Sequence, residues 1–267
     1  MEAAVPAGAA ATTAATGTAG RAPSSAQVPW MITVHLDSVV FDSVTVWDRV
    51  ARAVLAERAV TAGDRLPDPL VLALATGELR GISDALSHVI RSRTGASVTS
   101  TLIRLRIFHL LSSAVRDTDL ARPGAGELLT RIAATDARIA YLSSMPRTWV
   151  ETLDTHLGLP EPHVLLTTEQ LRSPRPDPYG HLLASHQLGV PARLGVALES
   201  GSDGISAALT AGLRVIAVVP KDMTGGTDRL TLVSDLRDVD LAAAREALCA
   251  DRALSRGPAG SALGDTA

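Results

Sequence analysis

Residues capable of acid–base or nucleophilic chemistry gather directly after short apolar runs of this sequence. They are His35 and Asp37, Ser143 and Ser144, the loop Arg172–Pro178 (RSPRPDP), and the stretch Glu199–Gly204. An imidazole beside a carboxylate is typical of a general base or a covalent acceptor, and a serine hydroxyl with adjacent amides can bind an anion. These residue types predict one polar site assembled from several separate segments.

The segments that position these residues form a repeated pattern of strands and helices. Six short, mostly apolar runs with little alternation are typical of parallel strands buried on both faces. They are ITVHL at 32–36, RIAYLS at 138–143, HVLLT at 163–167, LGVALE at 194–199, RVIAVV at 214–219 and TLVS at 231–234. Glycines at 158, 189 and 212 end the helices between them, and Asp177-Pro178 begins one. The pattern predicts an α/β fold, a Rossmann-like parallel sheet with helices on both faces and a site at the carboxyl ends of its strands.

The interval between the first two strands is far longer than one crossover helix needs. Its apolar residues recur at helical spacing, which predicts an inserted α-helical cap over the carboxyl edge of the sheet. Asp42 and Ser43 are expected to start the first cap helix. Both ends of the chain are rich in Ala, Thr, Gly, Pro and Ser and are expected to be disordered. The predicted divisions are a tail at 1–28, a core at 29–44 and 117–250, a cap at 45–116 and a second tail at 251–267.

Composition narrows the classes of function. The 267 residues contain one cysteine, Cys249, which excludes an intrachain disulfide framework and a cysteine metal cluster. The net charge of −3 gives no reason to expect nucleic acid as a partner. No apolar run is long enough to span a membrane and no secretory signal is recognised, so we expect a cytoplasmic protein without a membrane partner. Five histidines are expected to be surface or packing residues: His88, His109, His156, His181 and His186.

Four motifs in the right order carry a resemblance to a known family. HLDSVVFDS (35–43) resembles D-x-D-G-V-L-x-D-S, and RPGAGELL, the strand ending in Ser143 and the helix after it resemble the second motif region. SPRPDPY (173–179) resembles K-P-x-P-D-x-Y, and ALESGSDGISAALTAGLRVIAV resembles I-E-D-S-x-x-G-V-x-A-A-x-A-A-G-M-x-V-I-x-V. The chain therefore resembles the haloacid dehalogenase (HAD) superfamily, of the phosphoglucomutase and phosphatase type with a helical cap. The match covers roughly residues 30 to 245.

The chain departs from this family at the residues that do its chemistry. In the family, the first Asp of D-x-D attacks phosphorus and ligates Mg²⁺, and the second acts as general acid and base; the resemblance places His35 and Asp37 at these positions. The family's lysine corresponds to Ser173. Its acidic pair after the fourth strand corresponds to Glu199-Ser200. Nucleophile, cation and metal ligand are thus all replaced, and an imidazole is a poor donor for Mg²⁺.

Arginines and serines near these positions offer partial replacements. The chain's only lysine, Lys221, follows a different strand, and neither Arg172 nor Arg175 lies at the lysine's position in the sequence. The residues expected to bind a ligand or phosphate are Ser143, Ser144, Ser173 and Arg172. No cofactor is expected; if Mg²⁺ binds at all, the expected ligands are Asp37, Glu199 and Asp203.

Two functional hypotheses remain open. In the first, the chain has lost Mg²⁺-dependent phosphatase activity and binds a small phosphorylated or anionic ligand, or a protein, as a pseudoenzyme. In the second, it is an enzyme with altered chemistry, in which His35 accepts a phosphoryl group or acts as general base and Asp37 orients its ring. A further reading of Asp37 is structural: its carboxylate accepts from backbone amides in the turn after the strand. A third hypothesis is a conventional metal-dependent phosphatase in which Asp203 replaces the carboxylate missing at Ser200.

Overall fold

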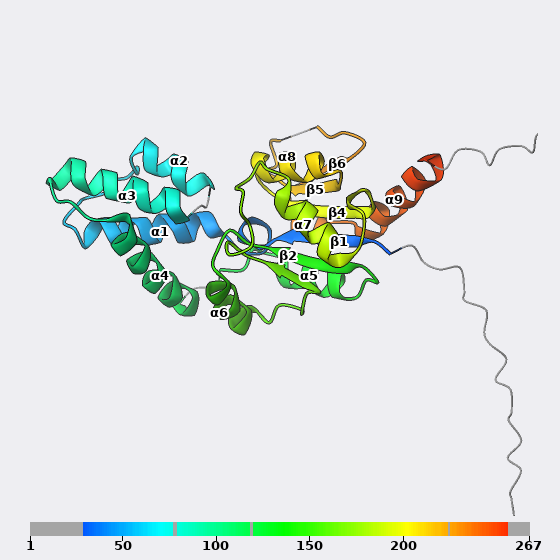
Figure 1. The fold of residues 1–267 in the computed structure, drawn as a ribbon, viewed down its shortest axis with the longest axis horizontal. Coiled ribbons are helices and arrows are strands. Elements are labelled where there is room, and N and C mark those ends of the chain that lie inside the picture. Colours follow the sequence, from blue (N-terminus) through cyan, green and yellow to red (C-terminus); the bar gives the residue numbers. More distant parts are fainter. Residues whose placement is uncertain (1–28, 77–78, 118–119, 224, 256–267) are drawn as a thin grey trace, which may run out of the picture.

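The computed structural model describes residues 29–76, 79–117, 120–223 and 225–255. A parallel sheet with helices on both faces forms the core, and four helices extend from it as a separate layer (Figure 1). The predicted α/β fold with an inserted helical cap is confirmed. Residues 1–28 and 256–267, where most of the two predicted tails fall, lie outside the described residues.

Six strands form the sheet in the order β3-β2-β1-β4-β5-β6, and every pair of neighbours is parallel. The strands are β1 (Met31–His35), β2 (Arg138–Leu142), β3 (Val164–Leu166), β4 (Gly195–Glu199), β5 (Arg214–Val218) and β6 (Leu230–Val233). Each coincides with a predicted apolar run, within one or two residues at its ends. The central position of β1 places the end of this strand between β2 and β4, where the order of strands changes direction.

Nine helices are found among the described residues. They are α1 (Ser43–Ala56), α2 (Asp68–Thr76), α3 (Leu79–Thr94), α4 (Ser100–Asp117), α5 (Ala125–Ala133), α6 (Arg147–Leu157), α7 (Tyr179–Leu188), α8 (Ser202–Ala211) and α9 (Leu241–Ser255). Gly158, Gly189 and Gly212 end α6, α7 and α8 in the left-handed conformation, as the sequence predicts. The predicted C-terminal tail begins too early, because α9 continues to Ser255.

The two faces of the sheet pack on different helices because side chains alternate along each strand. Met31 of β1 and Ala197 of β4 belong to a core cluster with residues of α7 and α8. Ile32 and Leu198 belong to a second cluster with residues of α5, α6 and α9. Residues 33, 35 and 199 therefore share the face that α7 and α8 cover.

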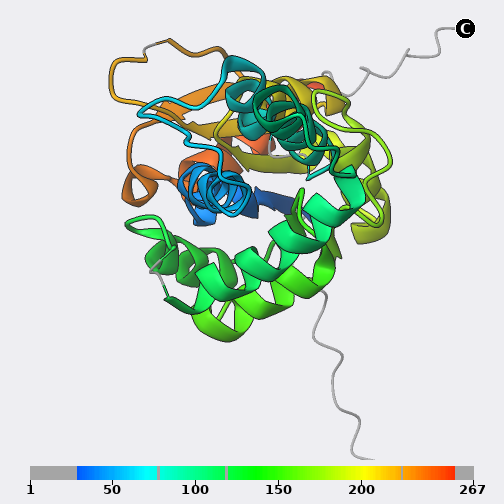
Figure 2. The same ribbon diagram turned by 90° about the vertical axis from the view of Figure 1, so that its left-hand side faces the viewer.

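Helices α1 to α4 form the cap beyond the carboxyl edge of the sheet (Figures 1 and 2). A single π-helical turn, Leu36–Val40, leads from β1 toward the cap. The cap's first helix begins where the sequence predicts, since Asp42 Oδ1 accepts a hydrogen bond from Thr45 N at 3.2 Å. None of the described helices is both long and apolar enough to cross a membrane. A cytoplasmic location stays a prediction.

Candidate functional site

The candidate site begins with two buried residues on neighbouring strands. The register pairs Thr33 of β1 with Ala197 of β4. Two residues further along each strand, His35 and Glu199 therefore come side by side on the face covered by α7 and α8. Both are buried, His35 at 2% exposure and Glu199 at 0%. A buried carboxylate needs compensation from its surroundings.

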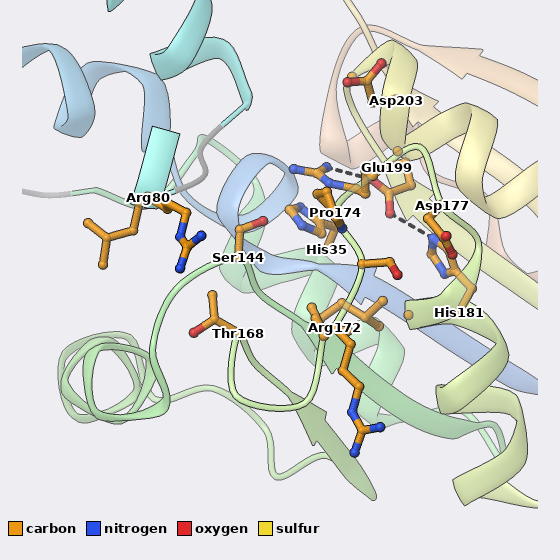
Figure 3. A pocket seen from close by; sticks show the side chains of 18 of the residues that line it. His35, Arg80, Ser144, Thr168, Arg172, Pro174, Asp177, His181, Glu199 and Asp203 are labelled. Carbon is orange, nitrogen blue, oxygen red and sulfur yellow. Dashed lines mark ion pairs between the residues drawn. The ribbon is translucent and has the colours of Figure 1, made fainter. Parts of the chain in front are cut away.

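Two cationic or polar side chains surround the Glu199 carboxylate. His181 of α7 places Nε2 3.2 Å from Glu199 Oε1, and its Nδ1 lies 3.1 Å from the hydroxyl of Thr33. Arg175, from the loop before α7, places Nη1 3.7 Å from Glu199 Oε2. Figure 3 shows both ion pairs as dashed lines that meet at Glu199. One carboxylate thus ties β4, the loop before α7 and α7 together.

The charges of this cluster shift the acidity of its members. Burial, followed by the nearby Arg175 charge, lowers the pKa of His35 from its ordinary value of 6.5. Burial opposes ionisation of Glu199, but His35, His181 and Arg175 together keep the pKa of this carboxyl below its ordinary value of 4.5. At neutral pH the site therefore holds an ionised Glu199 and a neutral His35.

Asp37 is buried as well, and its carboxylate is engaged by the loop after β2. Ser143 Oγ donates a hydrogen bond of 2.6 Å to Asp37 Oδ1, and the backbone N–H of Ser144 donates to Asp37 Oδ2. Ser143 Oγ in turn accepts from the backbone N–H of Met145. These contacts differ from the predicted structural role of Asp37, because the carboxylate accepts from a hydroxyl and one backbone N–H of the loop after β2 and not from amides of its own turn. Asp37 therefore holds the ends of β1 and β2 together.

His35 and Asp37 face each other without forming a short hydrogen bond. His35 Nε2 lies 3.7 Å from Asp37 Oδ2, the oxygen that already accepts from Ser144 N. The i and i+2 positions therefore do point the same way although Asp37 lies beyond the end of β1. The pairing that the second hypothesis requires is close, but the separation exceeds that of an ordinary hydrogen bond.

Two cavities meet at this cluster. The larger, of about 830 Å³, lies between cap and core and is lined by His35, His181 and Glu199. The smaller, of about 450 Å³, is lined by Asp37 and Ser200. The residues that line both are Ser144, Arg175 and Gly201. Arg175 thus lies between the two spaces, and the predicted site residues are divided between them.

The remaining predicted site residues do not all reach the cluster. Ser173 is half-buried and lines the larger cavity. Arg172 and Asp203 also line it but are exposed, and Figure 3 shows the Arg172 guanidinium and the Asp203 carboxylate pointing away from Glu199. The assignment of these two residues to a ligand or metal site stays a prediction.

Two residues at the centre of the site were not among the predicted ones. Arg175 is not aligned with the family's lysine, so the motif comparison does not select it, yet its guanidinium approaches the cluster from the same loop. His181 was assigned to packing, and it is indeed buried, but it also lines the larger cavity. A usable signal was that Arg175, between Pro174 and Pro176, is one of two arginines in the loop before α7.

Comparisons with known proteins give relatives of one kind. No protein-family model matches the chain. Hexitol phosphatase A of Escherichia coli (strain K12) is 28% identical over 134 residues, which are 50% of this chain and 61% of that protein. Protein CbbY of Rhodobacter capsulatus is 31% identical over 127 residues, 46% of this chain and 54% of that protein. The matched part therefore spans little more than half the length of these relatives.

Comparison with solved structures finds the same fold in related proteins. CbbY from Rhodobacter sphaeroides in complex with phosphate superposes with a TM-score of 0.67 at 20% identity, covering 82% of this chain and all of that one. The β-phosphoglucomutase of Clostridium difficile gives 0.68 at 14% identity, over 85% of this chain and all of that one. In sequence and fold the chain is similar to proteins of the HAD superfamily. Within it, the relatives found are of the phosphoglucomutase and phosphatase type.

The magnesium ion that the resemblance to the HAD superfamily implies does not fit the donor set of this chain. Mg²⁺ requires oxygen ligands in near-octahedral geometry. Here Asp37 and Glu199 line different cavities, and the Arg175 cation lies between them. Among the described residues no group of three or more His, Cys, Asp or Glu side chains is placed to hold a metal ion. We therefore derive no chemical step through Mg²⁺.

Proposed function

We propose that this HAD-like protein has lost Mg²⁺-dependent phosphatase activity and binds a small anionic ligand in the cleft between cap and core. A cleft of about 830 Å³ between cap and core has the size of a small-molecule site. Replacement of the nucleophile, the lysine and a metal ligand by His35, Ser173 and Ser200 supports the loss of catalysis.

One observation carries the proposal: the Arg175 guanidinium serves as the counter-charge of Glu199. In phosphoryl transfer the protein mainly positions groups and neutralises charge. A guanidinium can neutralise a carboxylate and bind an oxyanion, but it cannot place three or more oxygen ligands around a reacting phosphoryl group as a metal does. Arg175 therefore supports anion binding in this cleft and does not replace the metal's part in catalysis.

The other residues of the cluster have roles in this binding site. His181 and Thr33 fix the position of Glu199, which orients Arg175 toward the cavity. Arg175 and the hydroxyl of Ser173 then offer donors to an anion. His35, which is neutral at pH 7, contributes a hydrogen-bonding nitrogen without adding charge.

A second candidate function is hydrolysis through His35. The proximity of His35 Nε2 to Asp37 Oδ2, 3.7 Å, favours it. In this chemistry an imidazole nitrogen would attack the phosphorus of a monoester, and the P–O bond to the leaving group would break. The departing oxygen would take a proton from solvent. Water would then displace the phosphoryl group from nitrogen, which releases inorganic phosphate and restores the imidazole. Asp37 would stabilise the ring's positive charge during the first step.

Hydrolysis of p-nitrophenyl phosphate with Mg²⁺ or Mn²⁺ distinguishes the two candidates. The proteins compared are the wild type, His35→Ala, the triple variant His35→Asp/Ser173→Lys/Ser200→Asp, and that triple variant with Arg175→Gln added. The fourth protein is included because Arg175 contacts Glu199 and would compete with a metal ion there. Phosphate binding by calorimetry in EDTA, with wild type and Arg175→Gln, completes the set.

We expect wild type to be inactive, to bind phosphate without metal, and to lose that binding in Arg175→Gln. We expect activity to appear in the quadruple variant more than in the triple one. If wild type hydrolyses the ester and His35→Ala does not, the pseudoenzyme proposal is wrong and the second candidate holds. If wild type is active and His35→Ala is equally active, both proposals fail.

A further inference from the structure

The cap contributes an unusual combination of side chains to the larger cavity. Leu72 of α2, Leu79 and Arg80 of α3, and Arg104 of α4 line it. Among the described residues the cap supplies no carboxylate, amide or hydroxyl group to this lining. The hydroxyls of a sugar need many hydrogen-bonding partners when buried, and leaving them without partners is costly. This side of the cavity therefore favours a ligand with an apolar body.

The two cap arginines are available to an anion. Neither Arg80 nor Arg104 forms an ion pair with a carboxylate among the residues that the structure describes; Arg104 donates only to the hydroxyl of Thr101, at 3.0 Å. Figure 3 shows Arg80 extending from the cap toward the core side of the cavity. With Arg172 and Arg175 they make four cations on the lining of this cavity. The carboxylates on the lining are Glu199, which already has Arg175 and His181 as partners, and the exposed Asp177 and Asp203.

Apolar surface faces these cations from both sides of the cavity. Leu72 of the cap is 71% exposed and lines the cavity. On the core side the lining includes Leu142, Leu171 and Pro174. An apolar ligand body placed between these surfaces would bury Leu72, which is now open to water.

We propose that the ligand of this cleft is an organic oxyanion with an apolar body, such as an aryl or branched alkyl phosphate or carboxylate, and not a polyhydroxylated phosphate ester. This rests on the anion-binding function proposed above and adds the class of ligand to it. Arg80, Arg104 and Arg175 bind the charged head, while Leu72 and Leu79 contact the apolar body.

Calorimetric titrations of the full chain in EDTA test this inference. The probes are (1-naphthylmethyl)phosphonate, which is not hydrolysed, methylphosphonate, 1-naphthoate and glucose 6-phosphate. We expect the naphthyl phosphonate to bind at least about ten-fold more tightly than methylphosphonate, because burial of the ring removes apolar surface from water. Binding of 1-naphthoate would show that the site accepts a carboxylate group as well as a phosphonate group.

Matched variants localise the contacts. Leu72→Ser should weaken binding of the naphthyl phosphonate about ten-fold and leave methylphosphonate unchanged. Leu102→Ser is its control, because Leu102 is also an exposed cap leucine (56%) but does not line the cavity. Arg104→Gln should weaken both phosphonates about ten-fold. Arg93→Gln, on the exposed end of α3, is the control for charge removal in the cap.

The possible outcomes distinguish a failure of the apolar-body inference from a failure of the proposed anion-binding function. If both phosphonates bind equally and depend on Arg175, or if glucose 6-phosphate binds best, the cleft binds anions but the apolar-body inference is wrong. If Leu72→Ser and Leu102→Ser have equal effects, the inference is wrong as well. If no probe binds the wild type, the anion-binding function falls and this inference falls with it.

Discussion

Arg175 Nη1 lies 3.7 Å from Glu199 Oε2, and the carboxylate is completely buried while a quarter of the arginine side chain is exposed. A buried carboxylate that loses its cation is destabilising, because its desolvation is then not compensated. This relationship joins the loop before α7 to the end of β4, and it brings a positive charge to the place where the two cavities meet.

Arg175→Gln should therefore lower the free energy of unfolding by about 2 kcal/mol, less than for a fully buried pair because Arg175 reaches solvent. Urea denaturation at neutral pH measures this. The double variant Arg175→Gln/Glu199→Gln should be less destabilised than the sum of its single variants by about 1 kcal/mol, since the uncompensated charge is removed. Arg172→Gln, an exposed arginine of the same loop, should stay within about 0.5 kcal/mol of wild type. Additive effects of Arg175 and Glu199 would contradict the pairing.

The pKa of His35 predicts a dependence of stability on pH. This pKa is lowered in the folded protein, so the unfolded chain binds a proton first as the pH falls through 6.5. The contribution of His35 to the free energy of unfolding is therefore fully present above pH 6.5 and is lost as the pH falls toward the pKa of the folded state. The loss is at most about 1.4 kcal/mol per pH unit for one group. The lowered pKa of Glu199 adds a further loss only below its ordinary value of 4.5.

Thermal or urea unfolding at about pH 7.5 and about pH 5.5 tests this prediction, because that window isolates His35 from Glu199. His35→Gln should lose less stability than wild type over the window. His88→Gln, at an exposed histidine of α3, should lose as much as wild type does. An identical pH response of wild type and His35→Gln would show that the imidazole is not held neutral by its surroundings.

The sheet could be predicted from the sequence because its determinants are local. Buried parallel strands read as apolar runs, and glycines such as Gly158 and Gly189 mark helix ends wherever a left-handed residue is needed. The cap followed from one long interval between strands. The motif order then identified the family and the positions of His35, Asp37 and Ser143, which the structure brings to the same edge of the sheet.

The arrangement inside the site could not be predicted in the same way. Whether Arg175 or Arg172 reaches Glu199 depends on the conformation of one loop, in which side chains three residues apart point in different directions. His181 joins the site only because α7 packs on the face of β1 that carries Thr33, a tertiary contact without a sequence signature. The division of Asp37 and Glu199 between two cavities has the same origin.

Gly204 should be required for the burial of Glu199. A Cβ added at Gly204 would collide with the Glu199 carboxylate and lie 3.2 Å from Arg175 Nη1, so the glutamate would have to shift away from its partners. Gly204→Ala should cost about 1–3 kcal/mol of stability. Gly201→Ala is the matched control at the start of the same helix, because a Cβ there would have no neighbour within 4 Å. Equal stability of both variants, measured by urea denaturation, would contradict this account of Glu199.

The two adjacent serines after β2 should respond differently to alanine. Ser143 holds Asp37 through its hydroxyl, whereas Ser144 holds it through its backbone N–H, which alanine retains. Ser143→Ala should cost about 1–3 kcal/mol, because it leaves a buried carboxylate oxygen without this donor. Ser144→Ala should stay within about 0.5 kcal/mol of wild type. Urea denaturation of the two variants decides the point, and a larger loss in Ser144→Ala would mean that the contacts of Asp37 are assigned to the wrong groups.

Mg²⁺ should not stabilise the wild-type protein, because Arg175 occupies the neighbourhood of Glu199 and Ser200 replaces a carboxylate. A ligand that binds only the folded state adds about 2.7 kcal/mol at 100 times its Kd, which raises the melting temperature measurably. We expect no rise for wild type in MgCl₂ beyond that in NaCl of equal ionic strength. We expect a rise for His35→Asp/Ser173→Lys/Ser200→Asp with Arg175→Gln, in which two carboxylates are restored and the competing cation is removed. A rise specific to Mg²⁺ in the wild type would show that His35, Asp37 and Glu199 still provide a metal site, and the metal-independent function proposed for this cleft would have to be abandoned.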